Sequence, residues 1–103
     1  MNLDKNYFSV SETRYVYLDG RICADLDVFY SDLARQLHFP EYFGRNLDSL
    51  DEMLSDLEWV EEKKVHILLY HAFAFLSTLE GQKEEVLDIL KNPENKRIEF
   101  SII

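Results

Sequence analysis

The hydrophobic positions of this chain form three short apolar runs separated by longer segments of helical period. RYVYLD, residues 14–19, is rich in aromatic and β-branched residues and stops at the turn signal Asp19-Gly20, so it predicts a first strand. VHILLY, residues 65–70, is a nearly continuous apolar run, which is typical of a strand covered on both faces. RIEFSII, residues 97–103, predicts a last strand whose alternate residues, beginning with Ile98, share one face.

Helical spacing between the first two runs predicts two helices. Apolar side chains recur at this spacing in residues 25–39. Asp25 can cap the N-terminus of this helix, and Pro40 ends it because proline disfavours helical geometry at the preceding residue. Residues 46–57 show the same period and predict the second helix.

Two further helices are expected between the second and third apolar runs. Residues 71–81 predict a short helix that ends at Gly81, which can take the left-handed position after a helix. Residues 82–92 predict a last helix, stopped by Pro93. Parallel strands need helical crossovers, so this order predicts an α/β fold: a small three-stranded parallel sheet packed with about four helices.

The predicted helix at residues 46–57 separates apolar side chains from acidic ones. Its core-facing stripe consists of Leu47, Leu50, Met53, Leu54 and Leu57. Its opposite arc consists of Asp48, Asp51, Glu52, Ser55 and Asp56. Neighbouring carboxylates one turn apart, such as Asp48 and Glu52, repel each other. The helix dipole favours acids only near the N-terminus, so it does not explain the whole cluster.

A turn sequence, FPEYFGRN at residues 39–46, leads into this acidic helix. Pro40 stiffens the turn, and Gly44 can supply a positive φ. We expect Phe43 to pack in the core and Tyr42 to lie on the surface, because tyrosine is a rigid amphipathic side chain enriched at interface anchors.

Length and charge narrow the function classes. We expect a single domain over residues 14–103, after a loosely ordered N-terminal arm at residues 1–13. The formal charge of −9 on 103 residues argues against direct binding of nucleic acid, because phosphates would be repelled. It favours fast approach to a basic partner, although an acidic surface that serves only solubility would have the same composition.

Neither an enzyme nor a membrane protein is expected. Cys23 stands alone, so it forms no intramolecular disulfide and no thiolate metal site. Cys23 with His38, His66 or His71 is a candidate pair of nucleophile and base, but no oxyanion-type glycine loop accompanies it. The N-terminus lacks a secretory signal and no apolar stretch approaches the roughly 20 residues of a membrane span, so we expect a soluble, cytoplasmic protein.

Metal and cofactor sites are not expected either. His66 and His71 do not have the usual spacing of metal ligands. Asp48, Asp51 and Glu52 could hold a cation weakly, but the sequence contains no calcium-loop pattern.

The turn and acidic helix resemble the signature of the barstar family, intracellular inhibitors of secreted barnase-type ribonucleases. The family pattern is a proline, a glutamate, two aromatic residues, a glycine, any residue, then asparagine, leucine and aspartate before an apolar helix with a further acid. The matching residues are Pro40, Glu41, Tyr42, Phe43, Gly44, Asn46, Leu47, Asp48 and Leu50. A looser likeness extends over residues 16–103 and implies the family's fold, a three-stranded parallel sheet with four helices.

The resemblance implies a partner-binding site on the turn and the acidic arc. Its residues would be Tyr42, Gly44, Asn46, Asp48, Asp51, Glu52 and Ser55. The family's principal aspartate, which fills the nuclease's phosphate pocket, corresponds here to Glu52, and its interface tryptophan corresponds to Asp51. An outlying glutamate on the family's last helix has no clear counterpart, and Asn92 is the nearest position.

The implied function is inhibition of a basic ribonuclease, secreted or delivered by contact, by an antitoxin or immunity protein that is a monomer when free. The acidic helix and preceding loop would mimic RNA phosphates and block the nuclease's active site. The alternative is an acidic binding module for another basic protein or toxin that is not a nuclease.

Overall fold

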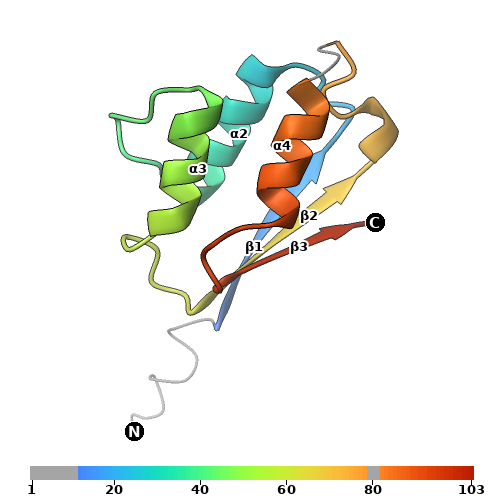
Figure 1. The fold of residues 1–103 in the computed structure, drawn as a ribbon. Coiled ribbons are helices and arrows are strands. Elements are labelled where there is room, and N and C mark those ends of the chain that lie inside the picture. Colours follow the sequence, from blue (N-terminus) through green and yellow to red (C-terminus); the bar gives the residue numbers. More distant parts are fainter. Residues whose placement is uncertain (1–11, 79–81) are drawn as a thin grey trace, which may run out of the picture.

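Three parallel strands form one sheet in the described part of the chain. In the computed structural model, which describes residues 12–78 and 82–103, they are β1 (Thr13–Asp19), β2 (Lys64–Tyr70) and β3 (Ile98–Ile102). Their spatial order is β1-β2-β3, with β2 in the centre (Figure 1). The register pairs Val16 with Ile67 and Ile67 with Phe100. The predicted N-terminal arm lies outside the described residues except for its last two, of which Thr13 opens β1.

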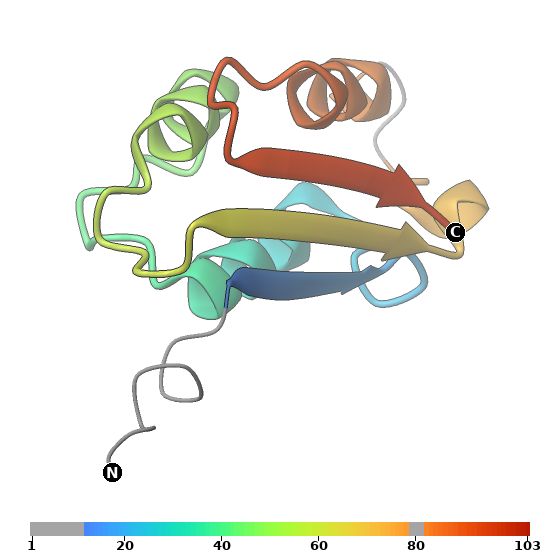
Figure 2. The same ribbon diagram turned by 90° about the horizontal axis from the view of Figure 1, so that it is seen from below.

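Three α-helices cover one face of this sheet. They are α2 (Leu26–Leu37), α3 (Leu47–Asp56) and α4 (Gln82–Lys91). All three run opposite to the strands, so each begins at the end of the molecule where the strands finish (Figures 1 and 2). The order of α-helices and parallel strands confirms the predicted α/β class.

Among the described residues, helices cover only one face of the sheet, so the prediction that its central strand is buried on both faces is wrong. The fully buried residues of β1 and β2 are Val16, Leu18, Val65, Ile67 and Leu69. The alternate residues of β2, which are His66, Leu68 and Tyr70, are only partly buried. On β1, Tyr15 and Tyr17 are each 52% exposed to solvent. The apolar run in β2 reflects a strand whose second face is shielded by aromatic neighbours rather than by helices.

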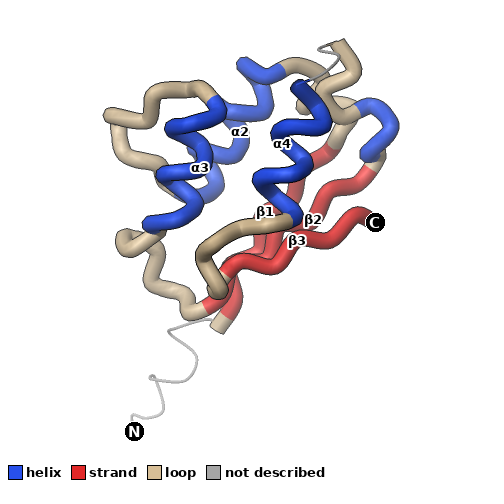
Figure 3. Tube along the Cα trace, in the orientation of Figure 1, coloured by secondary structure: helices blue, strands red, loops and turns tan. Residues whose placement is uncertain are grey.

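A fourth α-helix is absent from the described residues. The segment after β2 forms only the 3-10 helix η1 (Ala72–Ala74), followed by turns (Figure 3). Phe75 is extended, and the Leu76 N–H bonds the Cys23 carbonyl at 3.0 Å instead of one in its own segment. Phe75 and Leu76 are thereby both buried, so long-range contacts override the local helical preference. The predicted end of this helix, Gly81, lies outside the described residues.

The ends of α2 and α3 follow the capping rules, with small differences from the prediction. Asp25 and Asn46 each accept a hydrogen bond from the backbone three residues later, as N-caps do. Helix α2 ends at Leu37, two residues before the predicted end, because His38 takes a left-handed conformation with φ of 55°. Leu57, with φ of 51°, ends α3 in the same way.

Side chains from the loop before β3 satisfy the carbonyls at and beyond the C-terminus of α3. Asn95 donates to the Leu54 carbonyl at 3.1 Å. Arg97 donates to the carbonyls of Leu57 at 2.8 Å, Val60 at 2.7 Å and also Glu62. The Arg97 guanidinium thus complements the negative end of the dipole of α3. The helix has no basic residue of its own in its last turn.

The loop between α3 and β2 is also tied to β1. Arg14 makes a bidentate contact with Glu62, at 3.0 Å and 3.1 Å. Burial raises the pKa of Glu62, but the hydrogen bonds from Arg14 and from the backbone, together with the charges of Arg14 and Arg97, outweigh this effect and hold that pKa below its usual range. The C-terminal end of the acidic helix and the loop that follows it are therefore held by Arg97 from the loop before β3 and by Arg14 from β1.

We predict that Arg97→Ala destabilises the fold. Four carbonyls lose their donor, including that of Lys63 at 3.3 Å, and at about 0.5–1.5 kcal/mol per hydrogen bond the free energy of unfolding should fall by roughly 2–6 kcal/mol. Urea denaturation followed by circular dichroism measures this change. Lys96→Ala, at the exposed neighbouring position, is the control and should stay within about 0.5 kcal/mol of the original. Equal loss in both variants would contradict the role given to Arg97.

Candidate protein-binding surface

Burial of one side of α3 determines which side faces solvent. Leu50, Met53 and Leu54 are at most 4% exposed, and Leu57 directly after the helix is fully buried. This confirms the predicted core stripe, with Leu47 at its partly buried edge. The opposite side is exposed throughout and consists of Asp48, Asp51, Glu52, Ser55 and Asp56, which we call the acidic arc.

The carboxylates of the acidic arc are unpaired within the described part of the chain. Neither a hydrogen bond nor an ion pair reaches the side chain of Asp48, Asp51, Glu52 or Asp56 from residues 12–78 or 82–103. The ion pairs of the chain's arginines go to other acids: Glu62, Asp19, Asp32 and Asp27. The repulsion expected from the sequence is therefore not relieved inside this molecule.

The turn before α3 separates its two aromatic side chains as predicted. The Phe43 N–H bonds the Pro40 carbonyl at 3.0 Å and closes the turn. Phe43 packs edge-on against Phe39 and Tyr30, with ring centroids 4.9 Å and 5.5 Å apart. Tyr42 points away from the core and is 71% exposed, so a large amphipathic ring stands at the head of the acidic arc.

Ser49 joins this turn to the first turn of α3. Its hydroxyl accepts from the Gly44 N–H at 2.7 Å, and its own N–H donates to the Asn46 side chain at 2.8 Å. A Cβ on Gly44 would come within 3.2 Å of Asn46 and 3.3 Å of Ser49, so any other residue would require these neighbours to shift by a few tenths of an ångström. The predicted positive φ is not at Gly44 but at Arg45, with φ of 54°.

Arg45 holds the turn against α2. Its guanidinium donates to the Asp27 carboxylate at 2.6 Å, to the Asp27 carbonyl at 2.9 Å and to Ser31 at 3.0 Å. These bonds stabilise a left-handed backbone that costs a non-glycine residue about 1–2 kcal/mol. The sequence motif leaves this position open, so its structural role was not predictable from the pattern.

The seven predicted site residues fall into two groups. Tyr42, Asp48, Asp51, Glu52 and Ser55 present exposed side chains. Gly44 and Asn46 instead build the turn, since the Asn46 amide is engaged by Ser49 and the Gly44 carbonyl. Asn92 is not brought into the acidic arc by any described contact; its side chain bonds Asp88 one turn earlier in α4.

The acidic arc offers hydrogen-bond acceptors and negative charge. Carboxylates on a docked helix are held in fixed relative positions and can accept bidentate bonds from arginine. In the described residues, no group of three or more His, Cys, Asp or Glu side chains is arranged to hold a metal ion. None of the described helices is both long enough and apolar enough to cross a membrane.

Cys23 is unsuited to nucleophilic chemistry. It is fully buried, and its thiol lies 3.7 Å from a carboxylate oxygen of Asp32. Burial, with a further contribution from the Asp32 charge, raises the pKa of Cys23 to about 12, so the thiol stays protonated at neutral pH.

A serine–histidine contact on the open sheet face escaped the sequence reasoning. The Nε2 atom of His66 lies 2.8 Å from the Ser101 hydroxyl, and Nδ1 lies 3.9 Å from a Glu99 oxygen. Strand register brings these residues together, which sequence distance conceals. The Glu99 separation exceeds hydrogen-bond distance, so no third group in the described part of the chain orients the imidazole as nucleophilic catalysis requires.

Comparison with known proteins agrees with this architecture. The family model described as "Barstar (barnase inhibitor)" matches residues 13–103. A Bacillus subtilis (strain 168) protein named "Putative ribonuclease inhibitor YrdF" is 34% identical over 92 residues, which cover 87% of this chain and 97% of the relative. Matches of this extent establish the family, and the chain belongs to the barstar family.

Proposed function

We propose that this protein inhibits a basic ribonuclease by placing the acidic arc and Tyr42 in the nuclease's active site. The observation that carries the proposal is the row of exposed carboxylates on α3 that finds no cation within the described residues. Family membership and the name of the Bacillus relative support a ribonuclease as the target class. The protein would act in the cytoplasm, as an antitoxin or immunity protein.

Ribonuclease active sites are suited to bind a row of carboxylates. They are lined with Arg, Lys and His, which bind phosphates and stabilise developing negative charge. Carboxylates on a folded helix can replace those phosphates without the ordering cost that a flexible chain would pay. Long-range attraction would also raise the encounter rate; the barnase–barstar pair is a standard example of such steering.

The composition of the acidic arc favours a nuclease with a more basic rim than barnase. Glu52 is one methylene longer than the aspartate that the family places there, so its carboxylate would be shifted in a pocket shaped for the shorter acid. Asp51 puts a charge where the family has a large ring. That charge is favourable only against a cationic surface, because an apolar one would desolvate it without a partner.

The same departures keep a second candidate open. An acidic binding module for another basic protein or toxin would use the same carboxylates, and Asp51 is the residue that favours it over a barnase-like target. Co-purification from the source organism followed by mass spectrometry distinguishes the two: recovery of a basic ribonuclease supports inhibition, and recovery of a different basic protein supports the second candidate.

We predict that Asp48→Ala and Glu52→Ala weaken binding of the partner while leaving the fold intact. Both side chains are exposed and unpaired, so each change should alter the free energy of unfolding by only a few tenths of a kcal/mol. Affinity is measured by calorimetry and stability by urea denaturation. Unfolding of either variant would show that these acids are structural, contrary to the proposed site.

Two controls accompany these variants. Glu99→Ala removes the same charge from the open face of the sheet and should leave affinity nearly unchanged. Leu50→Ala deletes a fully buried side chain from the other side of α3 and should cost roughly 2–5 kcal/mol of stability. If Glu99→Ala weakens binding as much as Glu52→Ala, net charge rather than the acidic arc governs recognition.

We predict that the double substitution Asp51→Trp and Glu52→Asp shifts preference toward barnase. It restores the ring and the shorter acid that the family carries at these positions. Inhibition of barnase and of the cognate ribonuclease is measured for the original and the double variant, at low and high salt. Tight inhibition of barnase by the original protein, little changed by the substitutions, would contradict this account of specificity.

A further inference from the structure

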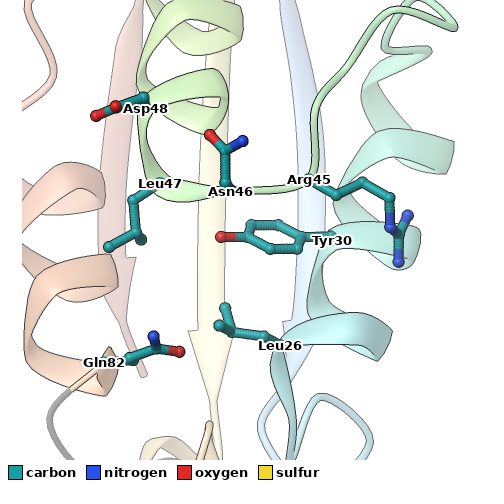
Figure 4. A pocket seen from close by; sticks show the side chains of 7 residues that line it. All are labelled: Leu26, Tyr30, Arg45, Asn46, Leu47, Asp48 and Gln82. Carbon is teal, nitrogen blue, oxygen red and sulfur yellow. The ribbon is translucent and has the colours of Figure 1, made fainter.

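A pocket of about 440 Å³ opens beside the acidic arc. Its lining residues are Leu26, Tyr30, Arg45, Asn46, Leu47, Asp48 and Gln82 (Figure 4). The volume is within the range of small-molecule sites. Two leucines and the Tyr30 ring supply apolar walls, and the Gln82 amide points toward the hollow. The pocket is thus separate in shape and chemistry from the convex row of carboxylates on α3.

The first turns of three helices surround this pocket. Leu26, Leu47 and Gln82, which line it, are the first residues of α2, α3 and α4. The first N–H groups of any α-helix have no acceptor within the helix, and the partial positive charge of the dipole lies at that end. These helix starts lie at the end of the molecule where the strands finish (Figure 1), and open α/β sheets bind ligands at the carboxyl ends of their strands.

An unpartnered hydroxyl points into the same space. Tyr30 is 4% exposed, and Figure 4 shows its hydroxyl directed toward the centre of the pocket. Within residues 12–78 and 82–103 this hydroxyl has no hydrogen-bond partner, although its ring contacts Phe29, Phe43 and Arg45. A buried polar group without a partner is costly, so it is an independent sign that something else binds there.

The hydrogen-bond donors that face the pocket determine which kind of ligand it can bind. Burial raises the pKa of Tyr30 against the opposing effect of Arg45, so the hydroxyl stays protonated and can donate. Glu84 and Glu85, in the first turn of α4, are exposed and do not line the pocket. The acids at the other two helix starts are engaged or turned away. Asp27 pairs with Arg45, Asp25 caps α2, and the Asp48 carboxylate points away from the hollow. The remaining polar groups are the helix-start N–H groups, the Tyr30 hydroxyl and the side-chain amides of Asn46 and Gln82. The N–H and O–H donors among them call for acceptor oxygens on the ligand.

We propose that this pocket binds a small organic oxyanion, a carboxylate or phosphate group attached to a compact apolar body. The anionic oxygens would accept from the Tyr30 hydroxyl and the helix-start N–H groups, and the apolar body would lie between Leu26 and Leu47. Asn46 and Asp48 belong both to the pocket lining and to the turn and acidic arc. Binding would therefore be coupled to partner recognition; this coupling rests on the proposed function, whereas binding itself does not.

Titration of the free protein tests the site without any ribonuclease. The probes are benzoate, phenyl phosphate and the neutral isostere benzamide, each followed by amide chemical shifts at 0.1 M salt, where charge repulsion is screened over about 10 Å. We expect saturable shifts of Leu47, Asp48 and Gln82 with at least one anion, and weaker binding of benzamide. The better anion identifies carboxylate or phosphate as the natural group. No saturable shift with either anion, or equal binding of benzamide, would overturn the proposal.

A single-atom deletion provides the decisive comparison. Tyr30→Phe keeps the ring and removes the hydroxyl, so the Kd of the bound anion should rise about tenfold, as for loss of one hydrogen bond to a charged group. Tyr17→Phe makes the same change on the open sheet face and should not alter the Kd. The thermal midpoint of Tyr30→Phe should not fall, because its hydroxyl has no described partner. An unchanged Kd or a clear fall in this midpoint would refute the role of Tyr30.

Discussion

The docking of α3 is the contact on which the rest of this structure depends. Its apolar stripe packs in the core, where Leu50 and Leu57 are fully buried. Because the acidic arc lies on the opposite side of the helix, this burial leaves all of its residues facing solvent. The hydrophobic gain exceeds the repulsion between exposed carboxylates, which is only a few tenths of a kcal/mol for each pair. Arg97 then fixes the C-terminal end of the helix without neutralising the exposed face.

Most of this arrangement could be predicted because it follows from local periodicity. The two sides of α3, the caps at Asp25 and Asn46 and the parallel order of strands all depend on short-range patterns. The failures share a different cause. Phe75 and Leu76 leave a helical path to reach a distant part of the core, and the open face of the sheet depends on which elements pack across space.

The exposed acids of the candidate site could be predicted from the sequence, but the contacts that hold the preceding turn in place could not. Turn and helix signals placed Tyr42 outside and Phe43 inside without knowledge of the fold. The contacts of Arg45 with α2 and the position of Tyr30 in the pocket required the tertiary structure, because they join residues that no sequence period relates. A binding surface of charged residues is therefore easier to recognise from sequence than a pocket built where three helices begin.

The central claim is that unpaired charge on α3 guides this protein to a basic ribonuclease. Stopped-flow measurement of the association rate with the co-purified ribonuclease, over increasing salt, tests it most directly. The account predicts a steep fall in association rate as salt rises, with a smaller change in dissociation, because steering acts over distances that salt screens. An association rate that does not depend on salt would contradict the account.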